Sequence, residues 1–189
     1  NEQNAQDAAE QLRQQGGAGY ILEDGGQYRV LMSAYHTQEE AQTVKERLQS
    51  EGMDTSIYEF TSAATSFNVK GAENYVVIIQ EVFGSLPTLI QEVYDLSIAL
   101  DQGQMDLEAA NESLNTLITS INEQNEQLST IGSNSDNEVV GSLLDAVSST
   151  KQLLDTAAKA TTVAEMSTQL KYVQIQLIDQ YLGVIGQIE

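Results

Sequence analysis

"QYRVLMSAYHTQEEAQ", residues 27–42, begins as a strand and ends as a helix. Tyr28, Val30 and Met32 alternate with Arg29, Leu31 and Ser33, a pattern that predicts a strand. Thr37 and Glu40 then form the pattern of a capping box, which marks the start of a helix. The stretch therefore predicts a strand followed by a helix. The helix half of this unit occurs twice in the sequence, whereas the strand half occurs once.

The repeated part reads helix, glycine, strand, with an offset of 36 residues between its two copies. Asn and Thr are good N-cap residues, and a glycine after the last helical turn is a typical C-terminal cap. The turn signal "EDGG", residues 23–26, separates a strand ending near Leu22 from one starting near Gln27. The corresponding pairs are Asn1 and Thr37, Ala5 and Ala41, Ala8 and Val44, Leu12 and Leu48, Gly16 and Gly52, and Ile21 and Ile57.

By this offset, the first copy of the strand at residues 27–36 would precede Asn1, so we expect it to be absent from this sequence. Unpaired strand edges recruit partners. We expect a strand from another chain, a strand from residues 65–71 ("TSFNVKG"), or an open and poorly ordered sheet. A replacement strand is favoured, because a gap would leave apolar surface on the helices uncovered.

From about residue 72 the sequence predicts long helices with apolar residues at heptad spacing. Breaks near residues 101–104, 131–137 and 159–162 divide it into four segments, so 72–189 reads as a four-helix bundle or two helical hairpins. Pro87 should break or kink the first segment. Residues 61–71 are a linker or an extra strand. The stripes form the bundle core or leave a seam for a partner protein or a homodimer. Their main members are Ile79, Leu86, Val93, Leu100, Leu107, Leu114, Leu117, Ile121, Leu128, Val140, Val147, Leu154, Met166, Leu170 and Leu177.

Composition excludes several classes of partner. The chain has 8 Lys and Arg against 28 Asp and Glu, a net charge of −20, so it should repel nucleic acid and anionic lipid. It has no cysteine and one histidine, so neither a metal site nor a cofactor is expected. His36 is interpreted as a solvated turn residue rather than a general base. No apolar run looks long enough to span a membrane, and the chain is not expected to be an enzyme.

The strand in residues 27–33 has two faces. Tyr28, Val30 and Met32 form the better set for packing against the helices. The other face then carries Gln27, Arg29, Leu31 and Ser33. An arginine among neutral hydrogen-bonding groups on an open sheet suits a flat polar ligand such as a sugar chain. The alternative is an ordinary solvent-facing strand.

Residues 28–60, "YRVLMSAYHTQEEAQTVKERLQSEGMDTSIYEF", resemble the second half of a SPOR domain. Tyr-Arg-Val opens the pattern, Ser33, Ala34 and Tyr35 hold its small-small-aromatic position, and Ser33 replaces the usual glycine. Glu-Ala then starts the helix, and Leu48 and Gly52 close it. Residues 4–16, "NAQDAAEQLRQQG", are similar to the first helix of the family. The resemblance covers residues 1–60.

The resemblance implies an α+β fold: a ferredoxin-like unit of two helices on a small antiparallel sheet, here lacking its first strand, followed by the all-α bundle. It implies binding of peptidoglycan glycan strands stripped of stem peptides, with Gln27, Arg29, Leu31 and Ser33 as ligand candidates. It also implies an envelope protein of cell division or sporulation, outside the cytoplasm and tethered by an upstream transmembrane helix. A scaffold protein acting through its bundle is the alternative.

Overall fold

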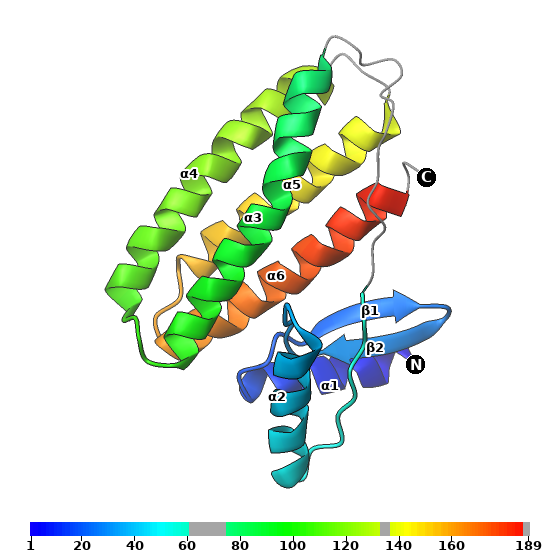
Figure 1. The fold of residues 1–189 in the computed structure, drawn as a ribbon, viewed down its shortest axis with the longest axis vertical. Helices are drawn as coiled ribbons and strands as arrows, with labels where there is room; N and C mark the ends of the chain where they lie inside the picture. Colours follow the sequence, from blue (N-terminus) through cyan, green and yellow to red (C-terminus); the bar gives the residue numbers. More distant parts are fainter. Residues whose placement is uncertain (61–74, 133–136, 187–189) are drawn as a thin grey trace.

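The computed structural model describes residues 1–60, 75–132 and 137–186. A small α+β unit made by residues 1–60 lies against one end of a bundle of four long helices (Figure 1). The fold class expected from the sequence, an α+β unit followed by an all-α bundle, is confirmed.

The two helices of the α+β unit begin and end where the repeat predicts. In α1 (Glu2–Gln14) the Asn1 side chain accepts a hydrogen bond from the Asn4 amide at 3.0 Å. In α2 (Gln38–Ser50) Thr37 and Glu40 form a full capping box. Each helix is followed by a glycine with positive φ, 85° at Gly16 and 89° at Gly52. The capping residues of both copies are thus confirmed.

Strands β1 (Tyr20–Asp24) and β2 (Gln27–Leu31) form an antiparallel hairpin. A two-residue loop joins them, with φ of 56° at Gly25 and 79° at Gly26. Positive φ at both positions is what a type I′ turn requires, and this turn matches the twist of the flanking strands. The turn therefore fixes the register, in which Leu22 lies opposite Arg29 and Asp24 opposite Gln27.

Helix α1 covers one face of the hairpin, with Ala5 and Ala9 buried. A Cβ on Gly17 would touch the side chains of both Leu12 and Met32. Met32 therefore lies close to Leu12 of α1. Tyr28 is also on this side, where the charges of Glu23 and Glu2 raise its pKa. Tyr28 and Met32 of the predicted helix-facing set therefore lie on the side of α1.

Within the described residues the sheet has two strands only. Residues 1–60 do not form a complete four-stranded sheet, in agreement with the expected absence of the first strand. The prediction of a short strand around Ile57 is wrong, since residues 53–60 have no strand assignment and Ile57 is 37% exposed. A strand needs a neighbouring backbone to pair with, and the described residues place none beside this segment. The proposed replacement strand at residues 65–71 falls outside the described residues.

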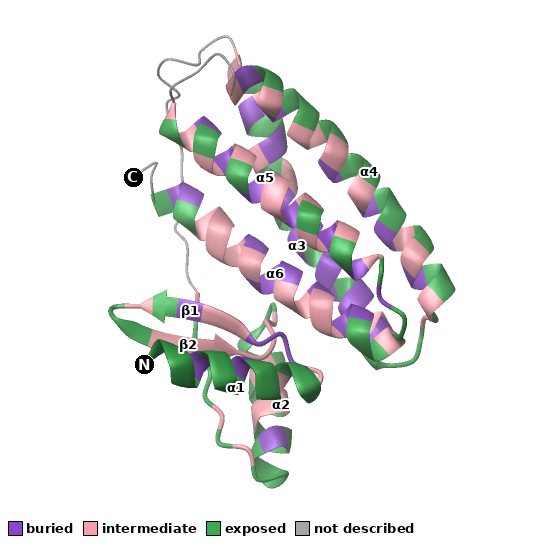
Figure 2. Ribbon diagram, turned by 180° about the vertical axis from the view of Figure 1, so that it is seen from behind, coloured by how far each residue is buried: buried purple, intermediate pink, exposed green. Residues whose placement is uncertain are grey.

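The bundle consists of α3 (Val76–Asp101), α4 (Leu107–Gly132), α5 (Glu138–Ala157) and α6 (Val163–Gly186). Around the bundle, α3 packs on α6, α6 on α5 and α5 on α4, while α3 and α4 contact each other more sparsely. Buried positions form a stripe along the inner side of each helix (Figure 2). The core is therefore the predicted one. Its fully buried members include Ile79, Leu86, Leu114, Ile121, Leu128, Leu154, Met166, Leu170 and Leu177.

Two expectations for α3 are corrected. Pro87 does not break the segment, because α3 continues through it. Although proline removes one backbone hydrogen bond, the flanking Leu86, Leu89 and Ile90 are all buried and hold the helix in the bundle. By length and composition α3, with a mean hydropathy of 1.3 in its most apolar window, could also cross a membrane. The sequence was expected to hold no such segment. In the structure α3 is a core helix of the bundle.

Candidate functional site

The four candidate residues follow one another along β2 and its exit. Gln27, Arg29 and Leu31 alternate within β2 and share one face of the hairpin, while Ser33 lies two residues past its end. Residues directly opposite each other in an antiparallel pair point to the same side. The register therefore adds three residues of β1 to this side. The Arg29 face, as we call it, consists of Tyr20, Leu22, Asp24, Gln27, Arg29 and Leu31.

Arg29 lies at the turn end of this face. Its Nε is 3.1 Å from Asp24 Oδ2, and its guanidinium carbon is 4.8 Å from the centre of the Tyr58 ring. The Tyr58 hydroxyl in turn donates to Asp24 Oδ2 at 3.3 Å. About half of the pair remains accessible, since the Arg29 and Asp24 side chains are 40% and 43% exposed. Arg29 is thus oriented by a carboxylate and an aromatic ring and still faces solvent.

The other end of the Arg29 face is covered by the bundle. The Tyr20 hydroxyl donates to Asp179 of α6 at 2.6 Å, and its ring meets Tyr172 edge-on at 5.2 Å. Burial, followed by the hydrogen bond to Asp179, raises the pKa of Tyr20. Leu22 between these ends is buried. From the sequence we expected the whole of this face to be open. That expectation is wrong, because the face is open only around Gln27 and Arg29.

Further contacts fix the α+β unit on the bundle. Lys171 of α6 donates to the Gly16 carbonyl at 2.9 Å and pairs with Asp101 of α3 at 2.7 Å. The His36 ring is 4.4 Å from the ring of Tyr94 and perpendicular to it. His36 is exposed in the turn between β2 and α2, which confirms the predicted turn position. Its contact with Tyr94 was not predicted.

Among residues 1–60, 75–132 and 137–186, no group of three or more His, Cys, Asp or Glu side chains could hold a metal ion. The side chains of the Arg29 face offer hydrogen bonding and ring packing. A guanidinium group has five N–H donors and no acceptor, and the Tyr58 ring beside it adds an apolar surface. This combination suits a ligand with several oxygen acceptors.

Sequence reasoning missed the residues around Arg29. Asp24 could have been found, because the two-residue "GG" turn places residue 24 opposite 27 and residue 22 opposite 29. Tyr20 follows from the same register. Tyr58 lies 29 residues from Arg29 in a segment without a strand, so no local pattern indicates that they meet.

Two helices on an antiparallel hairpin, with an arginine presented on the face away from α1, form a small α+β unit. Residues 1–59 match the family model of the SPOR domain, which is consistent with a partial SPOR domain in this part of the chain. SPOR domains bind peptidoglycan, have no catalytic role, and occur in periplasmic or envelope proteins. Comparison with curated proteins and with solved structures gave no significant match.

Proposed function

We propose that this chain binds glycan strands of bacterial peptidoglycan through the exposed part of its Arg29 face, without catalysing a reaction. The protein would act in the cell envelope, outside the cytoplasm, in cell division or sporulation. The observation that carries the proposal is the position of Arg29, which is held by Asp24 and Tyr58 on a partial SPOR domain and remains 40% exposed.

The geometry supports a sugar ligand in two ways. Sugar hydroxyl and N-acetyl oxygens accept hydrogen bonds from a guanidinium group, and Gln27 beside it is exposed and can both donate and accept. The ring of Tyr58, 36% exposed, offers a surface for the C–H face of a sugar. Leu31 and Ser33, both half-buried, lie farther from the turn, toward the end of the face that the bundle covers, and are left out of the proposed site.

Charge favours glycan that has lost its peptides. Stem peptides carry carboxylates, and a chain with a net charge of −20 repels them. Amidase hydrolysis removes the carboxylates of the peptide and leaves one lactyl carboxylate per disaccharide, so the glycan keeps a lower negative charge and the repulsion falls. We therefore propose a preference for stripped glycan strands over peptide-bearing ones.

The test is co-sedimentation of the full chain with purified sacculi, before and after digestion with an amidase that removes stem peptides. The expected result is increased binding after digestion. Binding that is absent in both samples, or that disappears when the peptides are removed, would contradict the proposal.

An assembly scaffold acting through the bundle is the second candidate function. Such a scaffold would bind a partner protein or form a homodimer. The observation that favours it is an apolar groove between α3 and α4 at the end of the bundle where their connection lies.

A further inference from the structure

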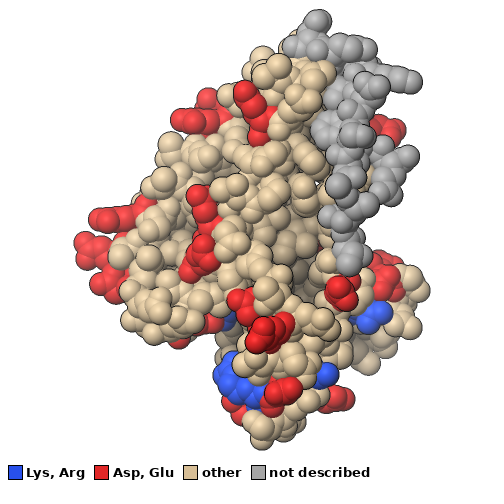
Figure 3. Space-filling model, in the orientation of Figure 1, with Lys and Arg blue, Asp and Glu red and all other residues tan. Residues whose placement is uncertain are grey.

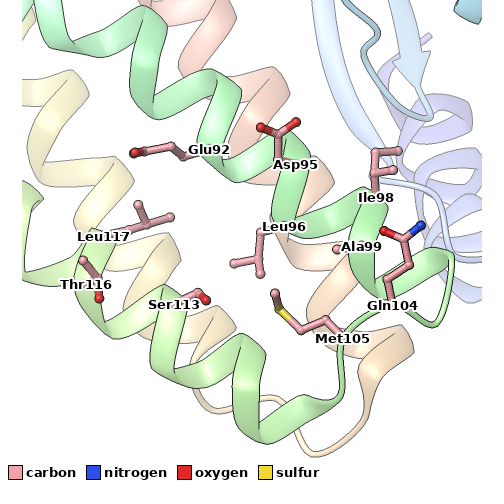
Figure 4. Close-up of a pocket in the computed structure, with 10 residues that line it drawn as sticks. All are labelled: Glu92, Asp95, Leu96, Ile98, Ala99, Gln104, Met105, Ser113, Thr116 and Leu117. Carbon is pink, nitrogen blue, oxygen red and sulfur yellow. The ribbon is translucent and has the colours of Figure 1, made fainter.

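The groove between α3 and α4 has a volume of about 660 Å³ (Figure 4). Its walls come from α3, from α4 and from the loop that joins them. Apolar side chains lie along the middle, while polar and acidic groups lie at the rim. The apolar members are Leu96, Ile98, Ala99, Met105 and Leu117, and the polar ones are Glu92, Asp95, Gln104, Ser113 and Thr116.

Small side chains explain why the groove is hollow. Ala99 on α3 and Ser113 on α4 face the space between the two helices (Figure 4). Neither can fill it, and α3 packs mainly on α6 while α4 packs mainly on α5. Leu96 and Leu117 are consequently left at the floor of an open groove, 5% and 9% exposed.

The two helices that form the groove carry charge of one sign. Residues 76–132 contain no Lys, Arg or His and nine Asp or Glu. The face of the bundle seen in Figure 3 accordingly shows acidic side chains on α3 and α4. The acidic residues are Glu81, Glu92, Asp95, Asp101, Asp106, Glu108, Glu112, Glu123 and Glu126.

We propose that this groove binds a basic amphipathic helix of a partner protein. A groove between two antiparallel helices accepts a third helix, whose apolar residues at i, i+3, i+4 and i+7 enter it. Lys or Arg on the flanks of that helix would pair with Glu92 and Asp95 at the rim. This inference rests on the second candidate function and is independent of glycan binding.

A second copy of the chain fits less well. Two molecules of net charge −20 repel each other. The acidic helices α3 and α4 of one copy would have to meet a surface of the other, which has 8 Lys and Arg in all. Charge complementarity therefore selects a basic partner.

The probe is a synthetic Leu/Lys peptide of about 18 residues, long enough to form a helix on binding, with Leu at the spacing of one helical face. A second peptide has the same composition in an order that gives no apolar face. Fluorescence anisotropy measures the affinity of each for the full chain. The amphipathic peptide is expected to bind at least about tenfold more tightly, a difference of ~1.4 kcal/mol. Equal affinities would mean general charge attraction and would overturn the proposal.

Two variants locate the binding. Ser113→Trp fills the groove and should weaken binding of the amphipathic peptide by about tenfold or more. Glu92→Gln with Asp95→Asn removes two rim charges and should weaken binding about threefold or more. Glu10→Gln with Asp145→Asn is the matched control, because it removes the same charges from positions on α1 and α5 outside the groove. The control should bind as the native chain does.

If the control weakens binding as much as the rim variant, or if the rim variant has no effect, the proposal fails. Analytical ultracentrifugation tests whether a second copy of the chain occupies the groove. A dimer that Ser113→Trp abolishes would assign the groove to a second copy and contradict the proposal. Sacculus binding by Ser113→Trp is expected to equal that of the native chain. A failure of the groove can therefore be distinguished from a failure of the glycan site.

Discussion

Gly19 shows how closely single residues determine the α+β unit. It lies between α1 and β1 with φ of 59°, and a Cβ at this position would collide with the Ala9 carbonyl oxygen. Its own carbonyl accepts a hydrogen bond from Arg13 Nη1 at 3.0 Å. Glycine is thus required both by the backbone conformation and by the close approach of the chain to α1.

Gly19→Ala should therefore lower the free energy of unfolding by about 2 kcal/mol or more, because it combines a left-handed conformation with a steric clash. Gly84→Ala is the matched control. Gly84 lies inside α3, and a Cβ added there would meet no neighbouring side chain, so alanine should stabilise the helix by about 0.5–1 kcal/mol. Urea denaturation of both variants measures this. A neutral or stabilising Gly19→Ala would contradict the described packing.

At the residue scale, sequence reasoning succeeded where the cause is local. The capping box at Thr37 and the left-handed glycines at Gly16 and Gly52 depend on neighbours within a few positions. Arg29 could be assigned to a face by alternation alone. Its contact with Tyr58 could not, because it joins segments 29 residues apart with no shared pattern.

Among the elements, the four bundle helices were predictable because their heptad stripes are long. The helix does not break at Pro87. Proline in a helix interior costs about 3 kcal/mol, whereas fully burying one leucine contributes about 1.5–3 kcal/mol. Leu86, Leu89 and Ile90 beside it are all buried. Tertiary packing therefore outweighs the local penalty. The predicted strand around Ile57 does not form, because no element within the described ranges supplies its pairing partner. Here the local pattern favours a structure that tertiary contacts do not support.

The groove between α3 and α4 gives a prediction at the scale of elements. Leu114 is fully buried, whereas Leu117, one turn further, is 9% exposed at the groove floor. Leu114→Ala should lower the free energy of unfolding by about 2–5 kcal/mol. Leu117→Ala should lie at the lower end of this range, because solvent already reaches its site. Chemical denaturation compares them, and a larger loss for Leu117→Ala would show that the groove is closed in solution.

On the scale of the whole molecule, the main feature that the sequence did not reveal is the docking of the α+β unit on the bundle. It depends on Tyr20, Lys171 and Asp179, which belong to segments far apart in the chain. The local sequence around each of these residues predicts an ordinary surface position. The docking matters for function, because it leaves only the turn end of the Arg29 face accessible (Figure 2).

The contact between Tyr20 and Asp179 predicts a dependence of stability on alkaline pH. Burial raises the pKa of Tyr20 in the folded chain, so the folded state retains a proton that the unfolded state releases above a pH of about 10. The stabilisation is present below that pH and is lost as pH rises toward the folded pKa. Between pH ~9 and ~11 the native chain should lose more unfolding free energy than Tyr20→Phe. Equal losses in denaturant titrations at both pH values would contradict the docking.

Glycan binding at the exposed end of the Arg29 face should depend on the Arg29 side chain. Arg29→Ala tests it against Arg47→Ala, which removes an exposed arginine of α2 that pairs with Glu51. Both variants should keep their stability to within about 1 kcal/mol, because exposed ion pairs contribute little. Charge-assisted hydrogen bonds contribute about 1.5–3 kcal/mol.

The decisive measurement is therefore the affinity of these two variants for amidase-treated sacculi in a co-sedimentation titration. We expect Arg29→Ala to weaken binding by about tenfold or more, while Arg47→Ala should bind as the native chain does. Native affinity in Arg29→Ala, or an equal loss in both variants, would contradict glycan binding at this face.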